Sequence, residues 1–259
     1  MEWLQSLYAS HYFSTVHLGL VVLHVTAALV SLLVAPVAMA VSKGGKAHRQ
    51  WGLVYFWGMV TVNSSALVLL VWRFNMFLFG ITVLTLYAVV TGYRSLRRKH
   101  PQQGDKPTAF DWGLTYSALL MGVGLVVWGI ATLLGLTQNF IPSGGSTAFI
   151  LGLLPLIFGV GILQNVLVDL RMFRNPPTDR NWWWYYHMDR MLGSYLGLFT
   201  ALMVQQVGPR LPESYAWIVW VAPTLIGTPL VSRWITHYRT KFDGKRQSVS
   251  AAQAGGVTF

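Results

Sequence analysis

The chain has 259 residues, of which 54% are hydrophobic and only 10% are charged. A soluble domain carries about 25% charged residues, so this chain has too little charge to cover a surface that faces water. The composition excludes an ordinary soluble domain and favours a protein whose surface meets lipid. Cysteine is absent, which excludes a disulfide framework, a thiolate nucleophile and a cysteine metal site.

The net charge of +11 comes from 19 Lys and Arg residues against 8 Asp and Glu residues. Such a charge is also typical of nucleic-acid-binding proteins, but here only Arg73 and Arg210 stand alone. The other basic residues fall in four groups, which occupy residues 43–49, 94–106, 171–190 and 233–246. The groups follow every second apolar stretch, as expected when Lys and Arg stay on the cytoplasmic side of a membrane. We therefore expect a membrane protein with no nucleic-acid partner.

Apolar stretches recur along the chain, and each is close to the ~20 residues that a helix needs to cross a bilayer. In chain order they occupy about residues 17–41, 51–72, 75–93, 112–136, 148–170, 190–208 and 215–235. The sequence therefore predicts an all-α fold, a polytopic membrane helix bundle of about seven transmembrane helices in contact with the lipid bilayer.

The basic groups also predict the orientation of this bundle. They place the N-terminus outside and the C-terminus in the cytoplasm. We expect residues 1–16 to form an external N-terminal segment and residues 17–240 to form the transmembrane domain. Residues 241–259, rich in Ser, Ala, Gln and Gly, are expected to form a flexible cytoplasmic tail. Glycines in the fourth and fifth stretches, such as Gly122 and Gly159, favour close packing between helices.

Ionisable residues within the predicted spans are few, and each is a candidate for function because a charge in a bilayer is costly. His24 lies in the first stretch, roughly 10 Å from the outer surface at about 1.5 Å per residue. Imidazole is a common ligand of haem iron and of other metals. The alternative is a histidine that only forms a hydrogen bond with a neighbouring helix.

Two further histidines lie at the predicted cytoplasmic end. His48 and Arg49 stand just before the second span, and His187 lies where the sixth span begins. His187, Met191 and Tyr195 follow one another at i, i+4 and i+8, so they line one stripe of that helix. The two histidines meet if the second and sixth spans are neighbours, which the sequence does not decide.

The inner end of the fifth span carries Asn165 and Asp169, one helical turn apart. A carboxylate at the membrane edge usually has a cationic partner, for which Arg49, Arg171 and Arg190 are candidates. These residues and the two histidines predict a polar cluster at the inner surface. An alternative interpretation is hydrogen bonding between helices together with contact to lipid headgroups.

The cluster suggests two kinds of cofactor. A metal ion would take its ligands from His48, His187 and Asp169. Haem b would take histidine ligands from His24, His48 and His187, with Arg49 and Arg190 available to pair with its propionates and Tyr195 on the same stripe as His187. No catalytic residue is predicted, because no pair of nucleophile and base is recognisable.

Two motifs resemble a known family. The first is His24 followed by Ala35-Pro36 and then by Lys43-Gly-Gly-Lys-Ala-His48-Arg49-Gln-Trp-Gly52. The second is His187-Met-Asp-Arg-Met-Leu-Gly-Ser-Tyr195. The pattern resembles a family of bacterial multi-span membrane proteins of unknown function, and it implies the bacterial cytoplasmic (inner) membrane. The His-Arg-x-x-Gly piece is also distantly similar to cytochrome b561-like and ferric-reductase-like helices, whose histidines ligate haem. This chain lacks their two histidines about a dozen residues apart on each of two helices, so the resemblance does not imply a two-haem electron pathway.

Three functions remain open from the sequence, of which an intramembrane enzyme that acts on a lipid, with His187 or Asp169 as acid or base, has the least support. The first is a redox protein that binds haem or a metal through histidines at helix ends. The second is a non-enzymatic protein. It would be either an accessory subunit or a transporter of a small molecule or lipid. As a subunit it would pack against another membrane protein or against a second copy of the chain. The motivation for the first is that histidines are prominent among the few polar residues near the predicted spans.

Overall fold

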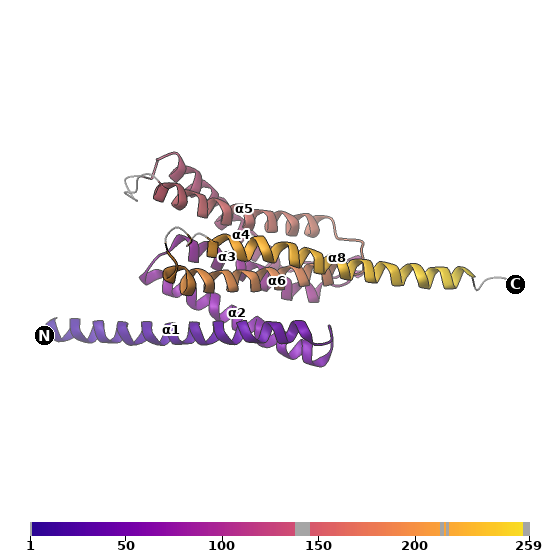
Figure 1. Cartoon of the computed structure of the whole chain (residues 1–259), viewed down its shortest axis with the longest axis horizontal. Helices are drawn as coiled ribbons and strands as arrows, with labels where there is room; N and C mark the ends of the chain where they lie inside the picture. The colour runs from indigo at the N-terminus through magenta and orange to yellow at the C-terminus, as the bar shows by residue number, and fades with distance from the viewer. Residues whose placement is uncertain (1, 138–145, 213–214, 216–217, 256–259) are drawn as a thin grey trace. The chain divides into compact units, whose positions relative to one another are not determined.

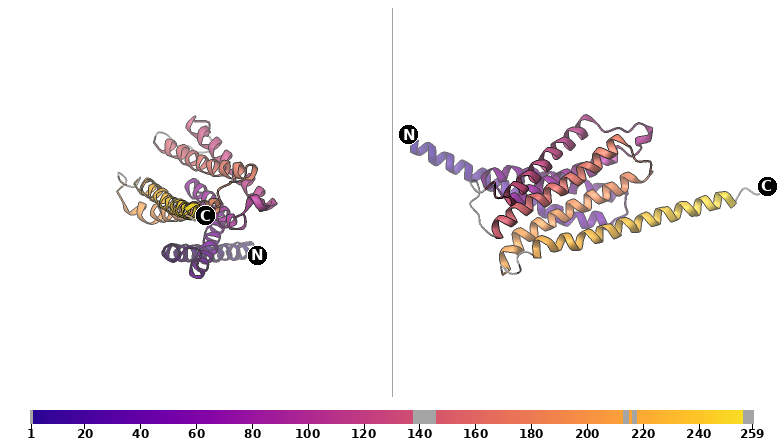
Figure 2. Two further views of the ribbon diagram at one scale, coloured as in Figure 1. Left: turned by 90° about the vertical axis from the view of Figure 1, so that its right-hand side faces the viewer. Right: turned by 90° about the horizontal axis from the view of Figure 1, so that it is seen from above.

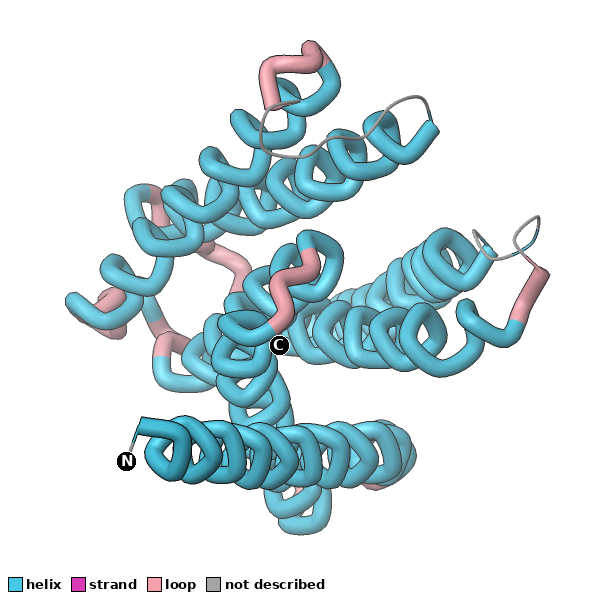
Figure 3. The backbone as a smooth tube through the Cα atoms, turned by 90° about the vertical axis from the view of Figure 1, so that its left-hand side faces the viewer, coloured by secondary structure: helices cyan, strands magenta, loops and turns pink. Residues whose placement is uncertain are grey.

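The structure is a computed structural model that describes residues 2–137, 146–212, 215 and 218–255. The described residues form helices joined by short connections, and none of them lies in a strand (Figure 3). The all-α prediction is therefore confirmed. The chain divides into two units, residues 1–201 and residues 202–259.

Long helices build the first unit (Figure 1). They are α1 (Glu2–Ala40), α2 (Lys46–Trp72), α3 (Met76–Arg94), α4 (Ala109–Leu133), α5 (Ser146–Arg174) and α6 (Trp182–Leu202). Two short 3₁₀ turns, η1 (Ser95–Arg97) and η2 (Pro101–Gln103), lie between α3 and α4. The second unit contains the π-helical turn η3 (Met203–Val207), the 3₁₀ turn η4 (Gly208–Arg210) and α8 (Ile218–Gly255).

Six helical segments among the described residues are long and apolar enough to cross a membrane. They are Thr15–Ala40, Lys46–Trp72, Met76–Arg97, Ala109–Leu133, Gly152–Arg174 and Ile218–Lys241. Each overlaps one of the predicted apolar stretches, and most of their first and last residues agree to within a few positions. Their length and composition indicate a multi-pass integral membrane protein.

The predicted span at residues 190–208 is the exception. It begins inside α6 and ends beyond the π-helical turn η3. The first turns of α6, from Trp182 to Arg190, are rich in aromatic residues and contain His187 and Asp189. These residues lower the apolar character of α6, so it is not among the six segments.

Both ends of the described chain are helical. α1 begins at Glu2, so most of residues 1–16 continues the helix of the first span rather than forming a separate segment. α8 continues to Gly255 and includes most of residues 241–259, for which the sequence predicts a flexible tail; residues 256–259 lie outside the described part. Lys, Arg, Gln and Ala have high helix propensity, so a polar composition alone does not end a helix.

α3 is the central helix of the first unit. On one side, Val89 belongs to an apolar cluster with Val34 of α1, Tyr55 of α2 and Leu198 of α6. On its other side, Tyr87 packs in a second cluster with residues of α4 and α5. Figures 1 and 2 show α1 on one side of the first unit and the α4–α5 pair on the other. This position makes α3 the most buried of the six apolar segments.

The helices that hold His48 and His187 are neighbours. The hydroxyl groups of Tyr55 on α2 and Ser194 on α6 lie 2.9 Å apart, and both side chains are buried. The structure therefore answers the question that the sequence leaves open about the second and sixth predicted spans.

Glycines bring α4 and α5 close together, as predicted. A Cβ atom built on Gly129 would lie 2.7 Å from the carbonyl oxygen of Gly152, and one on Gly159 would lie 2.8 Å from that of Gly122. Both distances are shorter than a van der Waals contact. Only glycine permits this backbone approach, which is a usual device for packing helices in a membrane.

Candidate functional site

Asp169 of α5 and Arg190 of α6 form an ion pair inside the first unit. Arg190 Nη2 lies 3.0 Å from Asp169 Oδ1, and the two side chains are only 3% and 1% exposed. Arg190 also donates to the side-chain oxygen of Asn165 and, over 3.1 Å, to its carbonyl oxygen. Of the three arginines that the sequence offers as partners, the structure selects Arg190.

Two tyrosines complete the shell of this carboxylate. Tyr186 of α6 donates to Asp169 Oδ1 over 2.5 Å, and Tyr87 of α3 donates to Oδ2. The Tyr87 hydroxyl also lies 3.2 Å from that of Thr115 on α4. The guanidinium carbon of Arg190 lies 4.7 Å from the centre of the Tyr186 ring. A buried ion pair is tolerated when further hydrogen bonds satisfy its atoms, and this network meets that condition.

The network connects α3, α4, α5 and α6. In it, the carboxylate of Asp169 accepts hydrogen bonds from Arg190, Tyr87 and Tyr186. Asp169 forms no hydrogen bond with His48 or His187. The structure thus separates the predicted polar cluster into the Asp169–Arg190 network and the histidines. Sequence reasoning missed Tyr87 and Tyr186. Tyr186 lies one helical turn before Arg190, a spacing that could have identified it, whereas Tyr87 has no such signal.

His48 and His187 are held in the same way. His187 Nδ1 lies 2.8 Å from the carbonyl oxygen of Gly92 on α3, and His48 Nδ1 lies 2.9 Å from that of Ala38 on α1. A carbonyl oxygen can only accept, so in each neutral ring the proton is on Nδ1. The lone pair is then on Nε2, which is the arrangement of a histidine that ligates a metal.

The two rings lie at the same end of the first unit. His48 stands in the first turns of α2, His187 stands in the first turns of α6, and their acceptors lie in the last turns of α1 and α3. The structure therefore places these two predicted ligands at one end of the first unit, and Asp169 is hydrogen bonded to neither of them.

Gly92 explains how α6 approaches α3 so closely at this point. A Cβ atom on Gly92 would lie 2.7 Å from Cβ of Arg190 and 3.1 Å from the methyl carbon of Met191. The carbonyl group of the same residue accepts the hydrogen bond from His187. One glycine thus sets the position of the histidine and of the arginine on the neighbouring helix.

The remaining predicted site residues lie around the histidines. Met191 and Tyr195 pack against the α1–α2 cluster, and the Tyr195 hydroxyl lies 3.5 Å from the carbonyl oxygen of Leu32. The stripe expected for His187, Met191 and Tyr195 therefore contacts α3 at His187 and Met191 and α1 at Tyr195. Arg49 is exposed next to His48, so it is accessible to an anionic group near that ring.

His24 belongs to a different place in the bundle. Its Nδ1 lies 3.0 Å from the carbonyl oxygen of Val62 and 3.0 Å from Ser65 Oγ, both on α2. Along α1 it is roughly 21 Å from Ala38, the residue whose carbonyl group holds His48. A single cofactor axis cannot use His24 together with the other two histidines.

Among the described residues, no three or more His, Cys, Asp or Glu side chains are grouped so that they could hold a metal ion. The comparisons with known proteins add no assignment. No family model matches the chain, and no curated protein or solved structure matches it.

Proposed function

We propose that this protein is a redox protein of the bacterial cytoplasmic membrane and that His48 and His187 would hold a b-type haem. The observation that carries the proposal is the matched anchoring of the two rings. Each Nδ1 is held by a backbone carbonyl group, and each Nε2 is left with its lone pair for iron. Bound haem would supply one-electron chemistry.

Haem suits this pair of residues better than a bare metal ion does. A protein-bound metal ion such as zinc takes three or four ligands from side chains, and the described residues offer no such group. A haem brings most of its iron ligands with it, so fewer protein side chains would be needed to hold it than to hold a bare ion. Arg49, exposed beside His48, would pair with a propionate.

The proposed topology has seven crossings, with the N-terminus outside and the C-terminus in the cytoplasm. α6 provides the additional crossing, and pairing of Arg190 with Asp169 reduces the cost of its charge in the bilayer. If α6 did not cross, the basic groups at residues 171–180 and 233–246 would lie on opposite sides of the membrane. The positive-inside rule favours a crossing that keeps them together.

A visible absorption spectrum of the purified protein tests the haem proposal. We expect a Soret band in the wild type and a change of that band, or its loss, in His48→Ala and His187→Ala. His100→Ala is the matched control, because His100 is an exposed histidine in the connection between α3 and α4. A colourless wild-type protein from haem-supplied cells would contradict the proposal and would favour the accessory-subunit or transporter alternative.

A further inference from the structure

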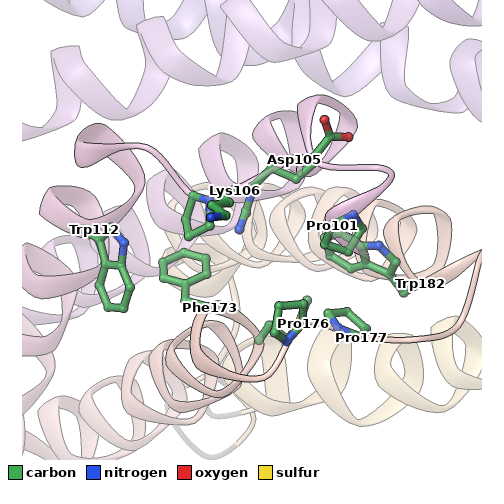
Figure 4. A pocket seen from close by; sticks show the side chains of 11 residues that line it. Pro101, Asp105, Lys106, Trp112, Phe173, Pro176, Pro177 and Trp182 are labelled. Atoms are coloured by element: carbon green, nitrogen blue, oxygen red, sulfur yellow. The ribbon is translucent and has the colours of Figure 1, made fainter. Parts of the chain in front are cut away.

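A pocket lies among the connections that join α3 to α4 and α5 to α6. Its volume is about 300 Å³, within the usual size range of small-molecule sites. The residues that line it are Arg98, Pro101, Asp105, Lys106, Pro107, Trp112, Met172, Phe173, Pro176, Pro177 and Trp182. Figure 4 shows Trp112 and Trp182 at opposite sides of this pocket, with Phe173 between them. None of the residues of the histidine pair or of the Asp169–Arg190 network lines it.

Two buried donors of this pocket have no partner. Arg98 and Trp182 are each only 7% exposed. The Nε atom of Arg98 and the indole Nε1 atom of Trp182 are buried without a hydrogen bond. Most buried polar groups in proteins are hydrogen bonded, and both of these unsatisfied N–H groups belong to residues that line the same pocket.

The charge of the pocket is positive. Asp105 accepts a hydrogen bond from the backbone N–H of His100 over 2.9 Å, and in Figure 4 its carboxylate points away from Phe173. The nearby Asp111 is paired with Arg94 over 2.6 Å. Among the described residues, Arg98 forms no ion pair with a carboxylate, although Asp111 is near enough to interact with it electrostatically. Lys106 adds a second positive charge to the lining.

The rest of the lining is apolar. Trp112, Phe173, Pro176 and Pro177 provide aromatic and proline surfaces. The guanidinium carbon of Arg98 lies 4.8 Å from the centre of the Phe173 ring. Contact with this ring orients the guanidinium plane. The N–H groups at the edge of the guanidinium plane stay available for an acceptor with several oxygens.

We infer that this pocket binds a phosphate group, with Arg98 and the indole N–H of Trp182 as donors and with the aromatic walls against an apolar part of the ligand. The phosphate comes either from the headgroup of an anionic membrane lipid or from a soluble phosphate compound. Both sources share the chemistry that the donors recognise. The inference does not depend on haem binding.

Binding to the full-length protein in detergent, measured by microscale thermophoresis, tests the inference. The probes are inorganic phosphate, short-chain phosphatidylglycerol and, as the zwitterionic comparison, short-chain phosphatidylcholine. We expect Arg98→Gln and Trp182→Phe each to weaken binding about tenfold or more, since each removes a donor to a charged group. The controls are Arg97→Gln and Trp183→Phe, which change the neighbouring residue of the same type and are expected to bind like the wild type.

The outcomes distinguish a lipid headgroup from a soluble phosphate compound as the ligand, and they also show whether the inference is wrong. Tight binding of phosphatidylglycerol alone, lost in Arg98→Gln and Trp182→Phe, supports a lipid headgroup. Binding of inorganic phosphate that the same variants lose supports a soluble ligand. If no probe binds the wild type, or if both variants bind like the wild type, the inference is wrong. If Arg98→Gln does not fold, Trp182→Phe decides alone, because it removes the N–H group and keeps an aromatic ring.

Discussion

Asp169 and Arg190 are charged side chains that have almost no contact with solvent. Removing two charges from water costs several kcal/mol for each ion, and their attraction offsets this cost only when the remaining hydrogen-bonding atoms are satisfied. Tyr87, Tyr186 and Asn165 supply those hydrogen bonds. The pair is thus stable as a group, and the loss of one member leaves the other as an uncompensated buried charge.

We predict that Arg190→Met lowers the free energy of unfolding by about 3–5 kcal/mol, the usual cost of breaking a buried ion pair. The measurement is equilibrium unfolding in a denaturing detergent. Arg171→Met is the control, because Arg171 is an exposed arginine near the end of α5, and its change is expected to be small. Equal stability of Arg190→Met and the wild type would show that the pair contributes little.

Helix α3 has an unusual role among the elements, because both apolar clusters and both polar sites use it. It contributes Val89 to one cluster and Tyr87 to the other. It also provides the Gly92 carbonyl group to His187 and the Tyr87 hydroxyl group to Asp169. The proposed haem ligand His187 and the ion pair between Asp169 and Arg190 are therefore both positioned by α3.

At the contact between α4 and α5, we predict that Gly129→Ala lowers the free energy of unfolding by about 1–3 kcal/mol, because the new methyl group overpacks the interface. Its Cβ atom would lie 2.7 Å from a backbone oxygen of α5. The matched control is Gly124→Ala on the same helix, which has no atom within 4 Å of the new Cβ atom. Unfolding measured by circular dichroism checks both variants, and an equal change in the two would contradict the close contact.

The helices could be predicted from the sequence because each apolar stretch is about as long as a bilayer is thick. α6 was predicted less accurately, because its position depends on contacts that composition does not report. Arg190 is acceptable there only because Asp169 lies on the adjacent helix. The structure has residues 241–255 in α8, and a polar composition is compatible with both a helix and the flexible tail that the sequence predicts.

Part of the candidate site was also within reach of the sequence. The partnership of Asp169 with one of three arginines followed from the cost of a lone carboxylate at the membrane edge. The common face of Met191 and Tyr195 followed from helical spacing. The carbonyl groups that hold His48 and His187 could not be predicted, because a backbone acceptor has no signature in the sequence. The role of Tyr87 could not be predicted either, because it depends on how α3 packs against α5.

At the scale of the whole molecule, the basic residues give a directional prediction. We expect a reporter that is active only in the cytoplasm to be active when fused at the C-terminus and inactive when fused after Arg73 or after Arg210. A matched reporter that is active only outside should give the reverse pattern. Activity of the cytoplasmic reporter after Arg210 would contradict a crossing by α6.

The pairing of Asp169 with Arg190 also bears on how the chain enters the membrane during synthesis. α5 is made first, and its carboxylate has no arginine partner until α6 has been made. A helix that carries an unpaired charge leaves the aqueous insertion channel for lipid at a considerable cost. In the proposed seven-span topology, α5 and α6 are therefore best released into the bilayer as a hairpin, with the charges already neutralised. Synthesis that stops between the two helices would leave a helix that the membrane accepts poorly and that cellular proteases can reach.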